Sequence, residues 1–578
     1  MNWKEQYTRW CKEVHLDVEL KEQIMLMEND LTHVEDCFYQ YLQFGTGGMR
    51  GEIGPGPNRM NIYTVRRACQ GLAEYIVETG EKEIDQGVVI AYDNRHKSKE
   101  FALEAAKTLG ANGIKTYVFS DIRPTPELSF AVRHLHAFAG IVITASHNPP
   151  EYNGFKLYGY DGGQVTSEVA ENITSKITKL QDELKLQVIE IKQLSEKGLL
   201  QFVDEEIDRV YLEQMEHIRV NKQLSQSSKD DLKIVYTPLH GTGAYLVQRG
   251  LKKHGFNNVT IVKEQENPDP SFSTVVSPNP EEKASFQLAI EYGHRLDGDI
   301  LLATDPDGDR LGVAVKNLDG DYVVLTGNQL GALILDYILS QKESLPKDGV
   351  LLKTIVTSEM GRAIARKYGL ETIDTLTGFK YIAEKIKEFE SNKDHTFIFG
   401  YEESFGFLIG DFVRDKDAIQ ACLVAAEMAA YHKSKGKSLF EALIDLYCQV
   451  GYYQEDLASL TLKGKHGTEK IQHIMNEFRS KKLDSIANGS IEVIEDYQNG
   501  VRYFSVSQKE EKINLPASNV LKFHLEVGSW FCLRPSGTEP KLKIYFGVRG
   551  EDLKSSDIML TRLKEAVMDN IEGFTKDE

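Results

Sequence analysis

Short apolar runs alternate with longer amphipathic stretches along most of the chain. Residues 87–92 (GVVIAY), 140–144 (GIVIT), 232–236 (LKIVY) and 299–304 (DILLAT) are typical of buried strands, and each ends in a turn rich in Gly, Pro, Asp or Asn. Strands that alternate with helices form α/β layers with largely parallel pairing. Ligand sites in such sheets lie beyond the carboxyl ends of the strands, so we expect the chemistry of this chain in those turns.

The length of the chain predicts several domains. Its 578 residues correspond to about four domains at roughly 150 residues each. A charged stretch at 180–198 and a polar segment at 225–230 precede a new strand, which indicates a boundary near residue 220. We expect three α/β domains and a smaller C-terminal α+β domain. The predicted limits are 1–220, 221–325, 326–455 and 456–578.

The composition is that of an ordinary globular protein, with 41% hydrophobic and 27% charged residues. A formal net charge of −19 disfavours binding to nucleic acid or an acidic membrane, so an anionic small substrate would need a locally basic cleft. The N-terminus lacks the apolar core of a signal peptide, and no apolar run approaches the ~18 residues that span a bilayer, so we expect a cytoplasmic protein. The six cysteines have no CxxC spacing and indicate neither a disulfide framework nor a zinc site.

A candidate nucleophile lies in the turn TASHNPP, directly after the apolar run at 140–144. Ser146 is well placed at a strand end, where the following turn can present backbone N–H groups to an anion. An ordinary polar turn is the alternative. The side chains of adjacent Ser and His residues usually diverge, so His147 is not automatically the base of a hydrolase triad.

The turn DPDGDR is a candidate metal site at another strand end. Asp305, Asp307 and Asp309 alternate along the chain, so they can face one side and supply hard oxygen ligands to Mg²⁺. A solvated acidic turn is the alternative. A calcium EF-hand is excluded, because its sixth and twelfth positions require Gly and Glu but are Arg310 and Lys316 here. Arg310 indicates an anion beside the metal, as phosphoryl transfer requires.

The segment GYEESFG follows an apolar strand at 396–399. Glu402 and Ser404 in it can bracket vicinal sugar hydroxyls, although a surface turn is an equal alternative. Upstream, the segment TGFK begins at Thr377. It could form a second polar rim, but a helix N-cap explains this threonine equally well.

Two further segments can approach phosphate. RPSGTEPK, which begins at Arg534 between two apolar strands, combines a guanidinium, two hydroxyls, a glycine N–H and a lysine, and we favour a phosphate cradle over a tight hairpin. FGTGGMRG at 44–51 is rich in glycine. Its spacing is neither G-x-G-x-x-G nor a P-loop, so a dinucleotide or ATP site is poorly supported.

With these five motifs in this order, the chain resembles the α-D-phosphohexomutase superfamily and is most similar to its long phosphoglucomutase/phosphopentomutase branch. The resemblance spans nearly the whole chain. It implies four domains around a central cleft: three related α/β domains with mixed sheets and a smaller C-terminal domain, each contributing one loop.

The resemblance also implies roles for individual residues. Ser146 would be the phosphorylated serine and, with the three aspartates of DPDGDR, a ligand of Mg²⁺. Some members carry a histidine directly after the sugar-loop serine, but Phe405 and Gly406 stand there in this chain. Proton transfer is therefore expected from His147, Lys156 or Lys416. The expected substrate-binding residues are Arg50, Arg310, Thr377, Gly378, Glu402, Ser404, Arg534, Ser536, Gly537 and Thr538.

The reaction that the resemblance implies is the interconversion of glucose 1-phosphate and glucose 6-phosphate, with glucose 1,6-bisphosphate as primer and a monomeric enzyme. A phosphopentomutase acting on ribose or deoxyribose phosphates is the main alternative, and a phosphomannomutase is the third. Two other classes remain open: a serine hydrolase or phosphatase, and a sugar-phosphate-binding protein without catalysis.

Overall fold

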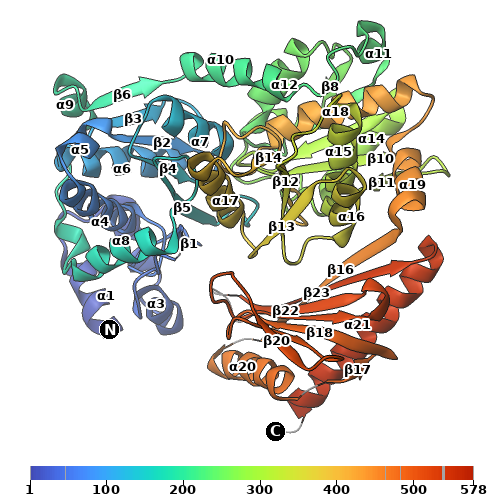
Figure 1. Ribbon diagram of the computed structural model, residues 1–578. Helices are drawn as coiled ribbons and strands as arrows, with labels where there is room; N and C mark the ends of the chain where they lie inside the picture. The colour runs from blue at the N-terminus through green and yellow to red at the C-terminus, as the bar shows by residue number, and fades with distance from the viewer. Residues whose placement is uncertain (1, 46, 463, 482, 537–540, 577–578) are drawn as a thin grey trace.

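The computed structural model describes residues 2–45, 47–462, 464–481, 483–536 and 541–576 (Figure 1). The chain forms three mixed α/β sheets in succession and then a largely antiparallel sheet, which lies below the others in Figure 1, drawn in orange to red. The predicted fold class is confirmed.

The first sheet has six strands in the order β1-β5-β4-β2-β3-β6. All residues of β2 and β4 are buried, and these strands contain the apolar runs predicted near 87–92 and 140–144. The strands are β1 (Gly48–Glu52), β2 (Val88–Tyr92), β3 (Thr116–Phe119), β4 (Ala139–Ile143), β5 (Tyr152–Gly159) and β6 (Leu200–Val203). The helices are α1 (Trp3–Lys12), α2 (Val18–Leu26), α3 (Leu31–Phe38), α4 (Ile62–Thr79), α5 (Glu81–Gln86), α6 (Ser98–Ala111), α7 (Thr125–His134), α8 (Ser167–Lys179), α9 (Ile191–Glu196) and α10 (Glu205–Gln214).

The second sheet has five strands in the order β11-β10-β9-β7-β8. The strands are β7 (Ile234–Thr237), β8 (Val259–Ile261), β9 (Ile300–Thr304), β10 (Leu311–Lys316) and β11 (Tyr322–Val324). The helices are α11 (Gln226–Asp231), α12 (Gly243–Lys253), α13 (Lys263–Glu266) and α14 (Gln287–Leu296).

The third sheet has four strands in the order β13-β12-β14-β15. The strands are β12 (Gly349–Thr354), β13 (Glu371–Thr375), β14 (Thr396–Glu402) and β15 (Gly406–Leu408). The helices are α15 (Gly327–Gln341), α16 (Glu359–Lys367), α17 (Phe379–Asn392), α18 (Ala418–Ser434) and α19 (Leu439–Val450).

The fourth sheet follows the order β16-β23-β22-β21-β18-β19-β20, with β17 paired to β18. The predicted boundary at residue 455 falls inside β16, which pairs with β23 from its first residue. The strands are β16 (Tyr452–Thr461), β17 (Ser485–Ile486), β18 (Gly489–Asp496), β19 (Val501–Phe504), β20 (Lys509–Lys512), β21 (Leu521–Leu525), β22 (Trp530–Pro535) and β23 (Lys541–Gly550). The helices are α20 (Gly464–Ser480) and α21 (Leu553–Lys576).

One strand arrangement recurs in the first three sheets. In each, a central strand (β2, β7 or β12) is parallel to both neighbours, and one neighbour (β4, β9 or β14) is followed by an antiparallel partner. The turns β4–β5, β9–β10 and β14–β15 are therefore equivalent in topology. These turns hold the TASHNPP, DPDGDR and GYEESFG motifs.

A continuous apolar core joins the first three sheets. It includes Tyr211 after the first sheet, Leu302 in the second and Phe399 in the third. Helix α18 begins at the N-cap Asp417, is buried through most of its length and packs against α12, as expected for a helix that is apolar on all sides. The shared core fixes the three equivalent turns relative to one another.

A smaller apolar cluster joins the third and fourth sheets. It includes Val356 and Leu376 from the third sheet region and Trp530 from β22. The buried Lys522 of β21 donates to the backbone oxygen of Ile355 at 2.7 Å. Among the described residues, no helix is long and apolar enough to cross a bilayer.

Candidate active site

The serine motif forms the turn between β4 and β5. Ser146 is 4% exposed and has a positive φ of 51°, and its amide donates to Thr144 Oγ1 at 2.8 Å. Its hydroxyl donates to Asp305 Oδ2 at 2.8 Å, and His147 Nδ1 lies 3.1 Å away. The expected divergence of the Ser and His side chains is therefore wrong. Burial and the charge of Arg310 lower the pKa of His147 well below its usual value, which favours a neutral imidazole.

The metal motif forms the turn between β9 and β10. The side chains of Asp305, Asp307 and Asp309 are buried, and one oxygen of each lies within 4.8 Å of the others. The amides of Asp309 and Arg310 donate to Asp305 Oδ1 at 3.0 and 2.9 Å. Thr125, at the start of α7, donates its hydroxyl to Asp307 Oδ2 at 3.0 Å. Residues of the first sheet region therefore orient the carboxylates of the second.

These carboxylates fit a magnesium ion. Asp307 Oδ1 and Asp309 Oδ1 are buried without a hydrogen-bond partner among the described residues. Burial, Asp307 and Asp309 together raise the pKa of Asp305 well above its usual value, so the cluster favours an added cation. Buried carboxylate oxygens are hard ligands of the kind that Mg²⁺ prefers. The protein thus provides a buried aspartate triad that can hold Mg²⁺.

Two lysines contact the same carboxylates from different elements. Lys156 in β5 lies 2.7 Å from Asp307 Oδ2, and Lys416, before α18, lies 3.0 Å from Asp309 Oδ2 and 3.2 Å from Asp415 Oδ1. Burial lowers the pKa of both lysines, but the carboxylates outweigh it and the net shift is upward. Both ammonium groups are therefore charged and can donate protons.

A central cleft of about 960 Å³ reaches all four sheet regions. Glu402 accepts a hydrogen bond from the amide of Gly378 at 2.9 Å, and burial raises its pKa to about 7 although Lys416 opposes the shift. The hydroxyl of Thr377 is buried without a partner among the described residues. Gly378 occupies the N-cap of α17, so the alternative of a threonine cap is wrong. The predicted site residues that line the cleft are His147, Arg310, Thr377, Gly378, Glu402, Ser404, Lys416 and Arg534.

The predicted phosphate-binding segment and Arg50 lie in the fourth and first sheet regions. Arg534 at the end of β22 donates to Tyr545 Oη at 3.4 Å, and the amide of Ser536 donates to the backbone of Lys541. Gly537 and Thr538 lie outside the described residues. Arg50 in β1 is exposed and is not among the residues lining the cleft; its Nη1 donates to Asn148 Oδ1 at 2.9 Å, so it contacts the serine turn instead.

The structure adds cationic and anionic residues that the motifs did not indicate. Lys543 lines the cleft and lies directly opposite Arg534 across the β22–β23 pair. Like charges at opposed positions of an antiparallel pair repel each other, so this pair favours an anion between them. Glu281 lines the cleft and forms an ion pair with Arg310. The sequence did carry a signal for Lys543, because Lys541 and Lys543 alternate with apolar residues along one strand and therefore point to the same face.

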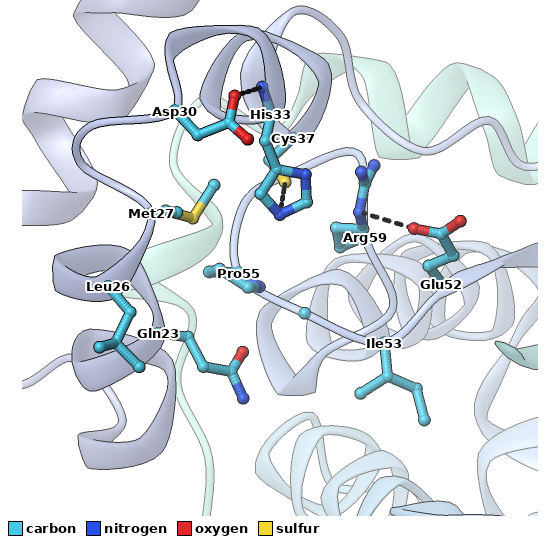
Figure 2. A pocket seen from close by; sticks show the side chains of 11 residues that line it. Gln23, Leu26, Met27, Asp30, His33, Cys37, Glu52, Ile53, Pro55 and Arg59 are labelled. Carbon is cyan, nitrogen blue, oxygen red and sulfur yellow. Dashed lines mark hydrogen bonds and ion pairs between the residues drawn. The ribbon is translucent and has the colours of Figure 1, made fainter. Parts of the chain in front are cut away.

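A second hollow, of about 410 Å³, lies between helices α2 and α3 and the segment 52–59 (Figure 2). His33 and Cys37 approach each other at its edge, and Arg59 forms an ion pair with Glu52. None of its lining residues lines the central cleft. The hollow is therefore separate from the serine and the aspartates.

The fold and the central cleft together define a class of α/β enzyme. A buried serine hydroxyl, a carboxylate cluster suited to Mg²⁺ and a neighbouring cleft lined by cationic side chains are the parts that phosphoryl transfer uses.

The chain belongs to the phosphoglucomutase/phosphomannomutase family. Family models for alpha/beta/alpha domains I, II and III match residues 41–184, 209–320 and 326–447, and the model for the C-terminal domain matches 492–557. A phosphoglucomutase of Staphylococcus haemolyticus is 38% identical over 529 residues, covering 91% of this chain and 94% of the relative. One from Staphylococcus aureus is 39% identical over 514 residues, covering 89% and 91%. The protein is thus an isomerase that transfers a phosphoryl group.

Solved structures share the fold. Parafusin, a phosphoglucomutase of Paramecium in an open form, aligns with a TM-score of 0.67 at 17% identity, covering 93% of this chain and 95% of the other. A phosphoglucomutase/phosphomannomutase family protein from Burkholderia thailandensis aligns with a TM-score of 0.65 at 19% identity, covering 92% and 97%.

The raised pKa of Glu402 predicts a pH dependence of substrate binding. Burial raises the pKa, and Glu403 adds to the effect, whereas Lys416, Arg310 and the Gly378 amide oppose it. Ionised Glu402 can accept two sugar hydroxyls, so KM for a sugar phosphate should fall by about tenfold as pH rises from about 6 to 8. In Glu402→Gln this part of the KM profile should be absent, leaving only the ionisation of the substrate phosphate. Parallel profiles in parent and variant would contradict this role.

Proposed function

We propose that this protein is a phosphoglucomutase that interconverts α-D-glucose 1-phosphate and glucose 6-phosphate through a phosphorylated Ser146. The observation that carries the proposal is the 2.8 Å hydrogen bond between the Ser146 hydroxyl and Asp305, within a buried carboxylate cluster that borders the central cleft. Relatives named phosphoglucomutase, at 37–39% identity over most of the chain, support the choice of sugar.

The proposed cycle starts when phospho-Ser146 donates its phosphoryl group to a hydroxyl of the bound sugar monophosphate. The product is glucose 1,6-bisphosphate, which also serves as primer for an unphosphorylated enzyme. The bisphosphate turns in the cleft, and its other phosphoryl group returns to Ser146. Such transfer depends on positioning and on offsetting negative charge more than on covalent chemistry by other groups.

Different residues of the chain would orient the sugar and transfer protons. Glu402 and Ser404 orient the sugar hydroxyls. Thr377, whose hydroxyl has no partner among the described residues, adds a further contact. Lys156 and Lys416 are charged and can each release a proton to the serine oxygen or the sugar oxygen as its bond to phosphorus breaks.

Mg²⁺ and His147 complete the proposed site. Mg²⁺, when bound by the three aspartates and a phosphoserine oxygen, would offset charge on the transferred group. The neutral imidazole of His147 can accept a proton at Nδ1.

The cradle around Arg534 would hold the phosphate that is not reacting. We include Ser536, Gly537, Thr538 and Lys543 in it. Arg310, the last residue of the metal turn, lines the same cleft and would also bind the substrate. Arg50 would act through the serine turn that it contacts.

We also propose domain limits near residues 220, 325 and 451, because α10, β11 and α19 are the last of the named helices and strands before each change of sheet. A monomeric, cytoplasmic enzyme is proposed from the superfamily resemblance.

Replacing the nucleophile tests the covalent step. Ser146→Ala should lose steady mutase turnover completely, because alanine has no hydroxyl to carry the phosphoryl group. Ser175→Ala, an exposed serine on α8, is the control and should behave as the parent. Residual activity of Ser146→Ala within roughly tenfold of the parent would exclude the phosphoserine route.

A direct comparison of sugars tests the substrate. We expect kcat/KM for glucose 1-phosphate to exceed that for ribose 1-phosphate by more than roughly tenfold, each measured with Mg²⁺ and its matching bisphosphate. A ratio reversed by the same factor would make the protein a phosphopentomutase. Release of inorganic phosphate without isomerisation would instead indicate a phosphatase.

Removing the cation opposite Arg534 tests the extended cradle. Lys543→Met should raise KM for glucose 1-phosphate by about tenfold with little change in kcat, since a charge-assisted hydrogen bond contributes about 1.5–3 kcal/mol. Lys509→Met, on the exposed strand β20 of the same sheet, should leave KM unchanged. Equal KM values for the two variants would remove Lys543 from the site.

A further inference from the structure

Arg95 lies between β2 and α6, directly beneath the serine turn, and is 3% exposed. Its Nη1 donates to the backbone oxygens of Pro149 (2.7 Å) and Tyr152 (3.0 Å). Its Nη2 donates to the backbone oxygens of Ser146 (2.6 Å) and Asn148. One guanidinium therefore holds four carbonyl groups of the turn that carries the nucleophile.

The charge of Arg95 is also paired. Its Nε lies 3.4 Å from Asp93 Oδ2, an ion pair without a hydrogen bond between the two atoms, and both side chains are fully buried. Asp93 is itself held, because its Oδ1 accepts hydrogen bonds from Ser98 Oγ (2.6 Å) and from the amide of Arg95 (3.0 Å). The ring of Phe272, from the second sheet region, lies 5.0 Å from the guanidinium carbon. The guanidinium is thus fixed from both sheet regions that form the reacting centre.

The serine turn needs such a support. Ser146 has a positive φ, which costs a non-glycine residue about 1–3 kcal/mol and persists only where the surroundings impose it. The carbonyls of Asn148 and Pro149 each precede a proline, so their peptide units have no N–H with which to build a turn. Among the described residues, the backbone groups of residues 146–149 make only two backbone hydrogen bonds, from the Asn148 amide to Ala145 and from the Tyr152 amide to Pro149.

Arg95 also determines where the next amide points. The C=O and N–H of a trans peptide point in opposite directions, so drawing the Ser146 oxygen toward Arg95 turns the N–H of His147 away from it. That N–H has no hydrogen-bond partner among the described residues. It can therefore donate to an anion on the Ser146 side chain, as backbone amides in phosphate-binding turns do.

We propose that Arg95 is a positioning residue for phosphoryl transfer: it fixes the turn at residues 146–152 so that Ser146 and the following amide present the phosphoryl group in line with the sugar hydroxyl. The inference rests on the proposed phosphoserine cycle. A lysine cannot replace Arg95, because an ammonium has three N–H donors without the planar fork that reaches four carbonyls and a carboxylate.

The test compares Arg95→Lys with Arg67→Lys. Arg67 is a second buried arginine of the same region; it is 6% exposed, donates to the backbone of Ile177 at 2.9 Å and does not contact the serine turn. Arg95→Lys should lower kcat by about 10–100-fold with KM for glucose 1-phosphate within about threefold of the parent, because small displacements of reacting groups carry costs of this size. Phosphate lost to water per isomerisation should rise several-fold. Arg67→Lys should retain the parent's kcat and the parent's ratio of phosphate released to sugar isomerised.

A second readout does not depend on the activity. Amide hydrogen exchange in residues 144–153 should accelerate in Arg95→Lys and stay unchanged in Arg67→Lys. If Arg95→Lys does not fold, Phe272→Leu, which removes the ring over the guanidinium, should show the same changes to a smaller degree. The proposal would be overturned if the Arg95 and Arg67 substitutions had equal effects on kcat, on phosphate release per isomerisation and on amide hydrogen exchange in residues 144–153. A parent without mutase turnover would refute the proposed function, and the exchange comparison would still decide whether Arg95 holds the turn.

Discussion

The hydrogen bond from Ser146 to Asp305 joins turns of two different sheets, and the proposed chemistry depends on keeping these two turns together. Several contacts reinforce it across the same boundary. Lys156 extends from the first sheet to Asp307, and Thr125 donates to the same carboxylate. The continuous apolar core beneath them makes separation of the two turns costly, because it would expose buried side chains of both regions.

Repetition of one strand arrangement explains how three unlike motifs reach one cleft. A strand that is followed by an antiparallel partner produces an equivalent turn each time, and the three turns carry the proposed nucleophile, the aspartate cluster and the glutamate proposed to bind sugar hydroxyls. The buried helix α18 packs against elements of the second and third regions. The fourth sheet supplies cations instead, from a hairpin that differs in topology.

Much of the α/β fold and of the candidate site was predictable from the sequence, because buried apolar strands end where polar turns begin. The positions of the TASHNPP, DPDGDR and GYEESFG turns follow from that pattern alone. Contacts between distant segments leave no such trace. Arg95 belongs to a turn with no motif of its own, and the pairing of Lys543 with Arg534 depends on strand register. Thr377 was ambiguous for the same reason, since only the backbone shows that Gly378 is the N-cap.

The most direct test is to follow the phosphoryl group itself. The enzyme is incubated with glucose 1,6-bisphosphate, mapped by peptide mass spectrometry, and then mixed rapidly with glucose 1-phosphate in the presence of Mg²⁺. The account predicts one phosphoryl group on Ser146 that is discharged to the sugar at least as fast as steady turnover. Phosphate on another residue, or discharge slower than turnover, would contradict it.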